Sequence, residues 1–439
     1  MNRNTAKNIA NRIFSIVSNE GGTTAHVFMS QGQGKSVSVR NAAIENFDDS
    51  TDVSIGITVW FGERTSHIAG NDLSPTSVET LVKKACEIAR AMEPNPFALI
   101  ASASLWPTNV DATIQSLNLS DTRELSVREL FDLAHIVESA GLAVPGVERT
   151  NDASAFFSRS TDFVFTSDGF ETEWESSDYG YGASFIASKD GQMEEDGRYD
   201  GMPHFSLLVS PDEIGRIAGE RTVRKLGAVS IKTGKMPVIF SRDVSGLIKS
   251  SLAGAINGER IYEGSSFLCG KLGERLFPEG VNIISDPSIP VFGSVPFDNE
   301  CVARRRIEFV KNGVLTSWSL DLKSAKQLGL TTTGNAGTIS VFYMENGKSS
   351  PEDLIARIPY GFYVTETMGH GPNRTTGDFS SGASGFLIEN GKLGRPVNGA
   401  TIAGNLLEMY QAVTPANDLE IGRYHSPTIM VNEMTVAGE

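Results

Sequence analysis

The chain has 439 residues, of which 40% are hydrophobic and 21% are charged. This length exceeds what one hydrophobic core ordinarily organises, so about two or three domains are expected, and the composition excludes a largely disordered chain. The formal net charge of −15 argues against a nucleic-acid-binding protein, because neutralising phosphates requires clustered Lys and Arg.

Helical and strand-like patterns alternate over residues 1–95. Hydrophobic residues at helical spacing predict an amphipathic helix over residues 4–18, where Arg12 interrupts the continuous apolar run that an export signal requires. Strand-like runs follow at residues 24–30, 36–40 and 53–61. A second helix is expected to begin near Pro75, which suits a first helical turn, with Ser74 as its N-cap.

A similar order recurs over residues 125–230, after a proline-bearing connection. A helix is predicted over residues 129–140, and a further helix begins at Ser210-Pro211. Between them lie strand-like runs at residues 153–158, 162–166, 171–177 and 182–188. The recurrence suggests a duplicated helix–strands–helix unit, with residues 1–95 and 125–230 as the two candidate subunits.

From residue 231 onward the pattern becomes rich in strands. A short buried strand at 237–240 precedes a helix over residues 243–256, and further helices are predicted near 319–328 and 404–411. Asn-Gly pairs, which favour the positive φ angles of type I′ turns, predict hairpins at Lys311-Asn-Gly313, Glu345-Asn-Gly347 and Glu389-Asn-Gly391. We therefore predict an α+β fold, with an N-terminal α+β region at 1–230 and a β-rich antiparallel C-terminal domain at 231–439.

The cysteines and the hydrophobic runs indicate the compartment. Cys86, Cys269 and Cys301 are odd in number and far apart, which is typical of reduced thiols. No run approaches the roughly 20 apolar residues that a membrane span requires. We expect a cytoplasmic protein that does not act at a membrane.

The glycine-rich stretch over residues 368–385 invites a catalytic interpretation, but the familiar motifs are missing. It lacks the G-x-S-x-G of a nucleophile elbow, and the chain has no G-x-x-x-x-G-K-[ST] phosphate loop. We name Glu366, His370 and Asp378 as candidate contacts of a cleft or a partner, and assign no catalytic residue. The alternative, a zinc-independent peptide-binding protein or hydrolase acting alone, would use these same side chains.

Histidines that could bind a metal are widely spaced. No two of the six stand within ten residues of each other, so no H-E-x-x-H pair exists. His135 and Glu138 have H-x-x-E spacing, and we interpret them as a solvated helix face. We therefore predict no metal ligand in this chain.

An ordered set of short segments resembles the TldD/PmbA family, known as modulators of DNA gyrase, over nearly the whole chain. The segments include Asp72-Leu-Ser-Pro75, Tyr262-Glu-Gly-Ser-Ser-Phe267, Thr332-Thr-Gly-Asn-Ala336, Gly385-Phe-Leu-Ile-Glu-Asn-Gly391 and Thr401-Ile-Ala-Gly-Asn405. The family has two branches that work together, and the resemblance implies that this chain belongs to one of them. The TldD branch carries H-E-x-x-x-H and a late cysteine that bind zinc.

Aligned on this resemblance, the zinc motif falls on Lys249-Ser-Ser-Leu-Ala-Gly254. Lys249 and Gly254 stand where the two histidines would be, and Ser250 stands where the general base would be. An ammonium repels a metal cation, so the match is to the TldE (PmbA) branch. The resemblance then implies a non-catalytic subunit without cofactor, which pairs with a zinc-bearing TldD-type peptidase to process unfolded or extended peptides. When alone, such a chain is expected to form a homodimer.

Overall fold

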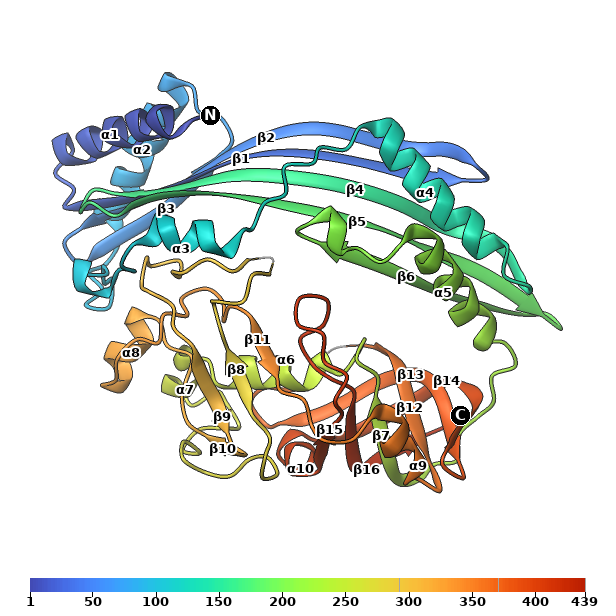
Figure 1. Cartoon of the computed structure of the whole chain (residues 1–439). Coiled ribbons are helices and arrows are strands. Elements are labelled where there is room, and N and C mark those ends of the chain that lie inside the picture. Colours follow the sequence, from blue (N-terminus) through green and yellow to red (C-terminus); the bar gives the residue numbers. More distant parts are fainter. Residues whose placement is uncertain (292, 370, 439) are drawn as a thin grey trace.

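The computed structural model describes residues 1–291, 293–369 and 371–438. The N-terminal region is built on a long antiparallel sheet of six strands in the order β3-β2-β1-β4-β5-β6, which curves above the C-terminal region in Figure 1. Its strands are β1 (Thr24–Arg40), β2 (Ala43–Phe61), β3 (Arg64–Gly70), β4 (Val147–Thr166), β5 (Glu171–Lys189) and β6 (Gln192–Met202).

Two units with the same order of elements build this sheet. The first runs from α1 (Arg3–Asn19) through β1–β3 to α2 (Pro75–Ala91), and the second from α4 (Val127–Leu142) through β4–β6 to α5 (Pro211–Arg224). The first strands of the two units, β1 and β4, pair at the centre of the sheet. The predicted recurrence of helix, strands and helix is therefore confirmed as an order of elements.

The strands are longer than the hydrophobic pattern predicts. Residues 24–30 and 36–40 belong to the single strand β1, because Gly32 and Gly34 pair with Asp52 and Ser50 of β2 instead of breaking the strand. Strands β3 and β6 were not predicted at all, since few of their residues are buried. Ser74 is the N-cap residue of α2 and Pro75 begins the helix, as predicted, but the Ser74 hydroxyl makes no cap bond and instead donates to Asp72.

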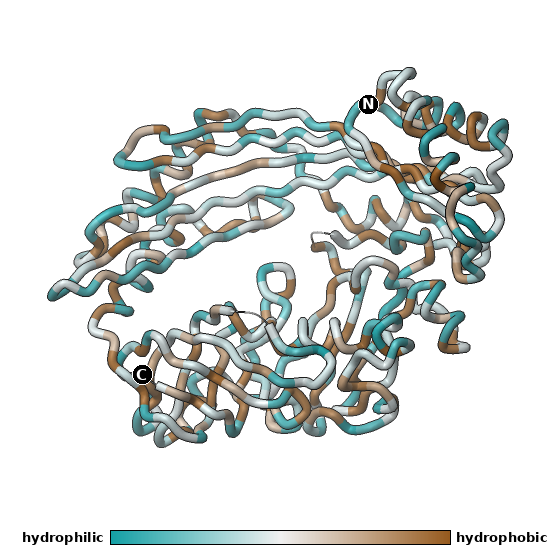
Figure 2. Tube along the Cα trace, turned by 180° about the vertical axis from the view of Figure 1, so that it is seen from behind, coloured by the Kyte–Doolittle hydropathy of each residue, from teal (hydrophilic) through white to brown (hydrophobic). Residues whose placement is uncertain are grey.

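Each pair of helices buries one end of the sheet. Ile13 of α1 and Val82 of α2 share a core with Val27, whereas Val137 of α4 shares another with Phe185. Along the long strands hydrophobic residues alternate with hydrophilic ones, as Figure 2 shows, and many turns at the strand ends are hydrophilic. A connection containing α3 (Val110–Leu117) links the units and packs on β5.

The C-terminal region contains a closed ring of strands. The sheet order is β14-β13-β12-β7-β16-β15, and β16 also pairs with β14. The strands are β7 (Gly234–Phe240), β12 (Tyr360–Met368), β13 (Asp378–Glu389), β14 (Lys392–Asn405), β15 (Val413–Pro415) and β16 (Ile429–Ala437). The prediction of a β-rich antiparallel region is confirmed, with one parallel pair, β7 with β12.

A smaller antiparallel sheet and short helices complete this region. The sheet has the order β10-β9-β8-β11, with strands β8 (Ile283–Ser285), β9 (Ile307–Lys311), β10 (Val314–Leu315) and β11 (Phe342–Met344). The helices are α6 (Gly246–Ala255), α7 (Gly258–Tyr262), α8 (Leu322–Leu328), α9 (Pro351–Ala356) and α10 (Leu406–Gln411).

Two of the three predicted hairpins are confirmed. Asn312-Gly313 and Asn390-Gly391 have positive φ and join β9 to β10 and β13 to β14. The hairpin predicted at residues 345–347 is wrong, because the chain runs on to α9 and the Gly347 amide donates to the Ala416 carbonyl at 2.7 Å.

Aromatic and charged side chains join the two regions. Phe297 packs edge-on against Phe170 and Trp174 of the N-terminal region, with ring centroids 5.3 and 5.6 Å apart. Arg423, on the loop that rises toward the sheet in Figure 1, binds the buried Asp200, with Nε 2.7 Å from Oδ1. The boundary at residue 230 stays a prediction. Among the described residues, no helix has the length and apolarity needed to cross a membrane.

Candidate functional site

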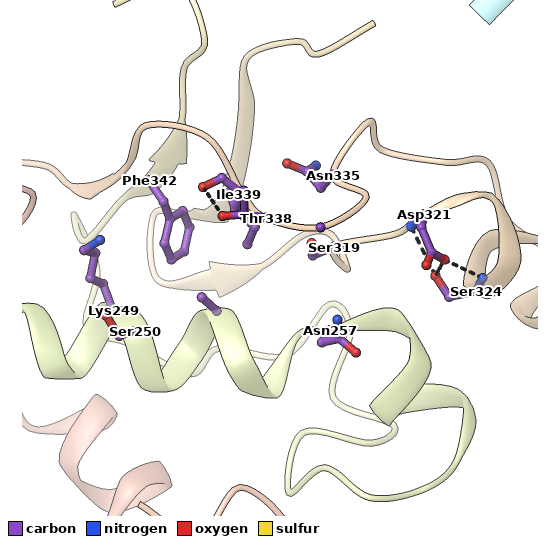
Figure 3. A pocket seen from close by; sticks show the side chains of 12 residues that line it. Lys249, Ser250, Asn257, Ser319, Asp321, Ser324, Asn335, Thr338, Ile339 and Phe342 are labelled. Atoms are coloured by element: carbon purple, nitrogen blue, oxygen red, sulfur yellow. Dashed lines mark hydrogen bonds between the residues drawn. The ribbon is translucent and has the colours of Figure 1, made fainter. Parts of the chain in front are cut away.

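A cleft of about 320 Å³ lies along α6, and we call it the α6 cleft. Lys249, Ser250 and Ala253 of α6 form one wall, as Figure 3 shows. Residues from the segment before β11 face them. The residues that line the cleft include Lys249, Ser250, Ala253, Asn257, Asp321, Asn335 and Phe342.

The opposite side of α6 is fixed in the core. Ile248 and Leu252 are fully buried, and the Ser251 hydroxyl lies 2.7 Å from the Tyr410 hydroxyl and donates to the Ile248 carbonyl at 2.6 Å. Because these contacts fix the rotation of the helix about its axis, Lys249 and Ser250 are directed to the cleft.

The Lys249 ammonium is the distinctive group of the α6 cleft. Its Nζ lies 5.7 Å from the centroid of the Phe342 ring, a cation–π contact. Burial lowers the pKa of Lys249 to about 8, and no charged neighbour in the described part of the chain contributes to that shift. Burial, and next the nearby charge of Lys249, lower the pKa of His425. Lys249 is therefore mainly protonated at neutral pH, beside a histidine that is mainly neutral.

The residues at the aligned motif position do not fit a zinc ion. Lys249 presents an ammonium and Ser250 a hydroxyl, and neither is a usual zinc ligand. Gly254 has no side chain, and a Cβ there would lie 2.7 Å from Nε of Arg374. A guanidinium therefore occupies the space into which a ligand at residue 254 would extend. More broadly, among residues 1–291, 293–369 and 371–438, no group of three or more His, Cys, Asp or Glu could hold a metal ion.

The site residues predicted from sequence do not converge on the α6 cleft. Glu366 of β12 pairs with Lys225, with Oε2 2.9 Å from Nζ. Asp378 begins β13, where it accepts a hydrogen bond from the Thr376 hydroxyl at 2.6 Å. Their roles stay predictions, and His370 lies outside the described residues. The glycine-rich stretch that holds Asp378 instead reaches α6 through Arg374.

Glu366 belongs to a second group of charges, which we call the Lys225 cluster: Lys225, Asp196, Arg221 and Glu366. Lys225 Nζ lies 3.1 Å from Asp196 Oδ2 and 2.9 Å from Glu366 Oε2, and Arg221 Nε lies 3.6 Å from Asp196. Burial acts to lower the pKa of Lys225, but Asp196 and Glu366 outweigh it and raise the pKa. This cluster links β6 and the end of α5 to β12, so it joins the two regions.

The interpretation of His135 and Glu138 as a solvated face is wrong for Glu138. Its side chain is 1% exposed, and it accepts hydrogen bonds from the Asn41 and Ala42 amides at 2.8 and 2.9 Å. Those residues form the turn between β1 and β2 and have positive φ. The carboxylate therefore satisfies a strained turn distant in sequence, which helical spacing alone did not indicate.

Models of three protein domains match this chain. They are the PmbA/TldA metallopeptidase domain 1 at residues 25–89, the central domain at 120–226 and the C-terminal domain at 233–438. Together they span most of the chain.

Curated relatives match over almost their full length. The chain is 34% identical to the metalloprotease PmbA of Escherichia coli O157:H7 over 419 residues, which is 94% of this chain and 92% of that protein. It is 31% identical to a PmbA homologue of Haemophilus influenzae, over 95% of this chain and 93% of the other. A TldD homologue of the same species is 25% identical, over 97% and 95%.

Solved structures share the fold. A candidate modulator of DNA gyrase from Bacteroides thetaiotaomicron superposes with a TM-score of 0.92 at 25% identity, covering 100% of both chains. TldE of Thermococcus kodakarensis superposes with a TM-score of 0.83 at 20% identity, over 98% of this chain and 100% of the other.

Proposed function

The chain belongs to the PmbA/TldD metallopeptidase family, and from that premise we propose that it is the non-catalytic, PmbA-like subunit of a two-subunit metallopeptidase. Its partner would be a TldD-type subunit that supplies the zinc ion and the general base. The pair would process unfolded or extended peptides in the cytoplasm, and this chain would bind no zinc.

The observation that carries the proposal is the chemistry at the aligned motif. Hydrolysis by a zinc peptidase needs imidazole ligands and a base for the attacking water. This chain presents the Lys249 ammonium and the bare Gly254 backbone, covered by Arg374. A relative named as a TldD homologue aligns over 97% of the chain, which supports a common fold for the two proposed subunits.

An open strand edge supports the handling of extended peptides. Strand β3 pairs with β2 only from Ile55 onward, so the part of β2 over residues 43–54 carries no outer strand within the described structure. Phe47 on this edge is 61% exposed. An extended peptide or a partner strand can add to such an edge through main-chain hydrogen bonds.

Reconstitution with a partner tests the proposal. The purified chain should contain no stoichiometric zinc and should cleave no unfolded peptide alone, and cleavage should appear when a TldD-type subunit is added. A matched control uses the partner with its H-E-x-x-x-H histidines replaced, and this mixture should be inactive. One tightly bound zinc per chain, or zinc-independent cleavage by the chain alone, would overturn the proposal in favour of an enzyme that acts by itself.

A further inference from the structure

The α6 cleft holds a positive charge that the described chain does not neutralise. Lys249 lies beside Phe342 and the neutral His425, and no carboxylate contributes to its pKa. Asp321 also lines the cleft, but Figure 3 shows it well separated from Lys249. Its Oδ1 accepts hydrogen bonds from the amide and hydroxyl of Ser324 at the start of α8. A half-buried ammonium without a counter-ion is poised to accept an anion.

Side-chain amides lie along the same cleft. Asn257 uses its Oδ1 to accept from the Arg260 amide at 3.2 Å, and no hydrogen bond of its Nδ2 is made within the described residues. Asn335 is 8% exposed and uses its Nδ2 to donate to Thr333, which leaves its Oδ1 as an acceptor. One donor and one acceptor are therefore available to the N–H and C=O groups of a peptide bond.

We propose that the α6 cleft is a binding site for a peptide carboxylate, with Lys249 Nζ as its counter-ion and the amides of Asn257 and Asn335, farther along the cleft in Figure 3, available to the main chain of the peptide. The carboxylate site follows from the geometry, whereas the choice of a peptide as its carrier rests on the proposed function. A C-terminal carboxylate and an Asp or Glu side chain share the chemistry that Lys249 recognises.

The charge of the cleft favours a single carboxylate over a phosphate. One ammonium matches one negative charge, and a dianion would leave charge uncompensated in a partly desolvated cleft that also contains Asp321. The cavity of about 320 Å³ suits a short peptide segment better than a folded domain.

Three model peptides identify the carboxylate. N-acetyl-trialanine has its C-terminal carboxylate as its only charge, its C-terminal amide has none, and N-acetyl-Ala-Asp-Ala-amide moves the carboxylate to a side chain. Calorimetric titration of the full chain at neutral pH should show binding of the free acid and at least tenfold weaker binding of the uncharged amide. Binding of the aspartyl peptide would extend the site to side-chain carboxylates, and its failure to bind would restrict the site to C-termini.

Two variants with the same change in charge test the role of Lys249. Lys249→Met should weaken binding of the free acid at least tenfold. Lys323→Met should leave it unchanged, because Lys323 already pairs with Glu259, with Nζ 2.5 Å from Oε1. Circular dichroism checks that both variants fold. Binding of the free acid to the native chain should also raise the pKa of Lys249, which the ¹³Cε chemical shift of labelled lysine reports.

Equal affinity for the free acid and its amide, no binding of any of the three peptides, or equal binding by Lys249→Met would overturn the proposal. These titrations use the chain alone. Their failure therefore leaves the proposed subunit role intact, and failure of the reconstitution leaves a carboxylate site intact.

Discussion

Lys225 and Lys249 are two partly buried amines with opposite surroundings. Lys225 Nζ lies within 3.1 Å of Asp196 and 2.9 Å of Glu366, and these carboxylates raise its pKa against the effect of burial. Lys249 has no such neighbour in the described chain, and burial lowers its pKa to about 8. The fold therefore uses one lysine to join its two regions and leaves the other available to a ligand.

The presence or absence of a carboxylate partner distinguishes the structural charge of Lys225 from the charge of Lys249, to which we assign a ligand. A buried ion pair is costly to break because the remaining charge loses its partner, whereas an unpaired buried charge opposes folding from the start. Removing the Lys225 ammonium should therefore destabilise the chain, and removing the Lys249 ammonium should stabilise it. Burial alone would predict the same direction for both lysines.

The largest effect is expected for Lys225→Met. It leaves Asp196, whose side chain is 15% exposed, with Arg221 as its remaining cation at 3.6 Å. The free energy of unfolding should fall by about 2 kcal/mol, which is less than the cost of breaking a fully buried pair because Glu366 is half exposed. Urea unfolding measures it. The control Lys235→Met removes an exposed pair with Glu433 and should change stability little. A loss no larger than in this control would refute a structural role.

Lys249→Met should stabilise the isolated chain by about 1 kcal/mol at neutral pH, after allowance for the solvent-exposed part of the side chain. The pKa of Lys249 in the folded chain, about 8, lies below the ordinary lysine value of 10.5, so the unfolded chain keeps this proton to higher pH. The burial penalty is complete below about pH 8 and disappears as pH rises to about 10.5. Unfolding measured across that window should show the advantage of the variant shrinking with pH. An advantage independent of pH would indicate packing as its cause.

The sequence predicts elements well where one face is buried. Alternation in residues 53–61 identifies the part of β2 that lies over the core, and the Asn390-Gly391 pair identifies its hairpin. The outer part of β2 is exposed on both faces and has no such pattern, so its strand depends on pairing with β1. Strand length in this sheet is thus set by pairing across the sheet, which local periodicity does not contain.

The candidate site is predictable only in part. The resemblance locates Lys249 and Gly254, but a lone lysine on a helix ordinarily indicates a solvated surface. Its burial depends on Phe342 and His425, distant in sequence, and on the α6 face that Ile248 anchors. No spacing in the sequence brings these residues together. Asn335 lies in one of the segments that carry the resemblance, which is the only sequence signal for the opposite wall.

A carboxylate introduced beside Lys249 should give its ammonium an ion-pair partner, as Lys225 has. Ala253 lines the α6 cleft one helical turn after Lys249, so Ala253→Glu places a carboxylate within reach. We expect the pKa of Lys249 to rise and binding of N-acetyl-trialanine to weaken, while stability changes by less than about 0.5 kcal/mol. Ala253→Gln has a similar volume without the charge, and it should leave the pKa unchanged. If both variants weaken binding equally, the effect is steric.

The smallest effect is expected for Glu366→Gln, and it distinguishes two roles for a residue that sequence identified as a candidate contact. Glu366 is 46% exposed, and Lys225 keeps Asp196 when its charge is removed. The loss of stability should therefore be under about 0.5 kcal/mol and should diminish at high salt. Asp196→Asn is the matched comparison, and it should lower stability more because Asp196 is 15% exposed and also faces Arg221.

Peptide cleavage by the reconstituted pair gives the second measurement. If Glu366 only joins β12 to the end of α5, cleavage will follow stability in both variants. A large loss of cleavage by Glu366→Gln without loss of stability would instead make Glu366 a substrate or partner contact, and the Lys225 cluster would then be more than structural.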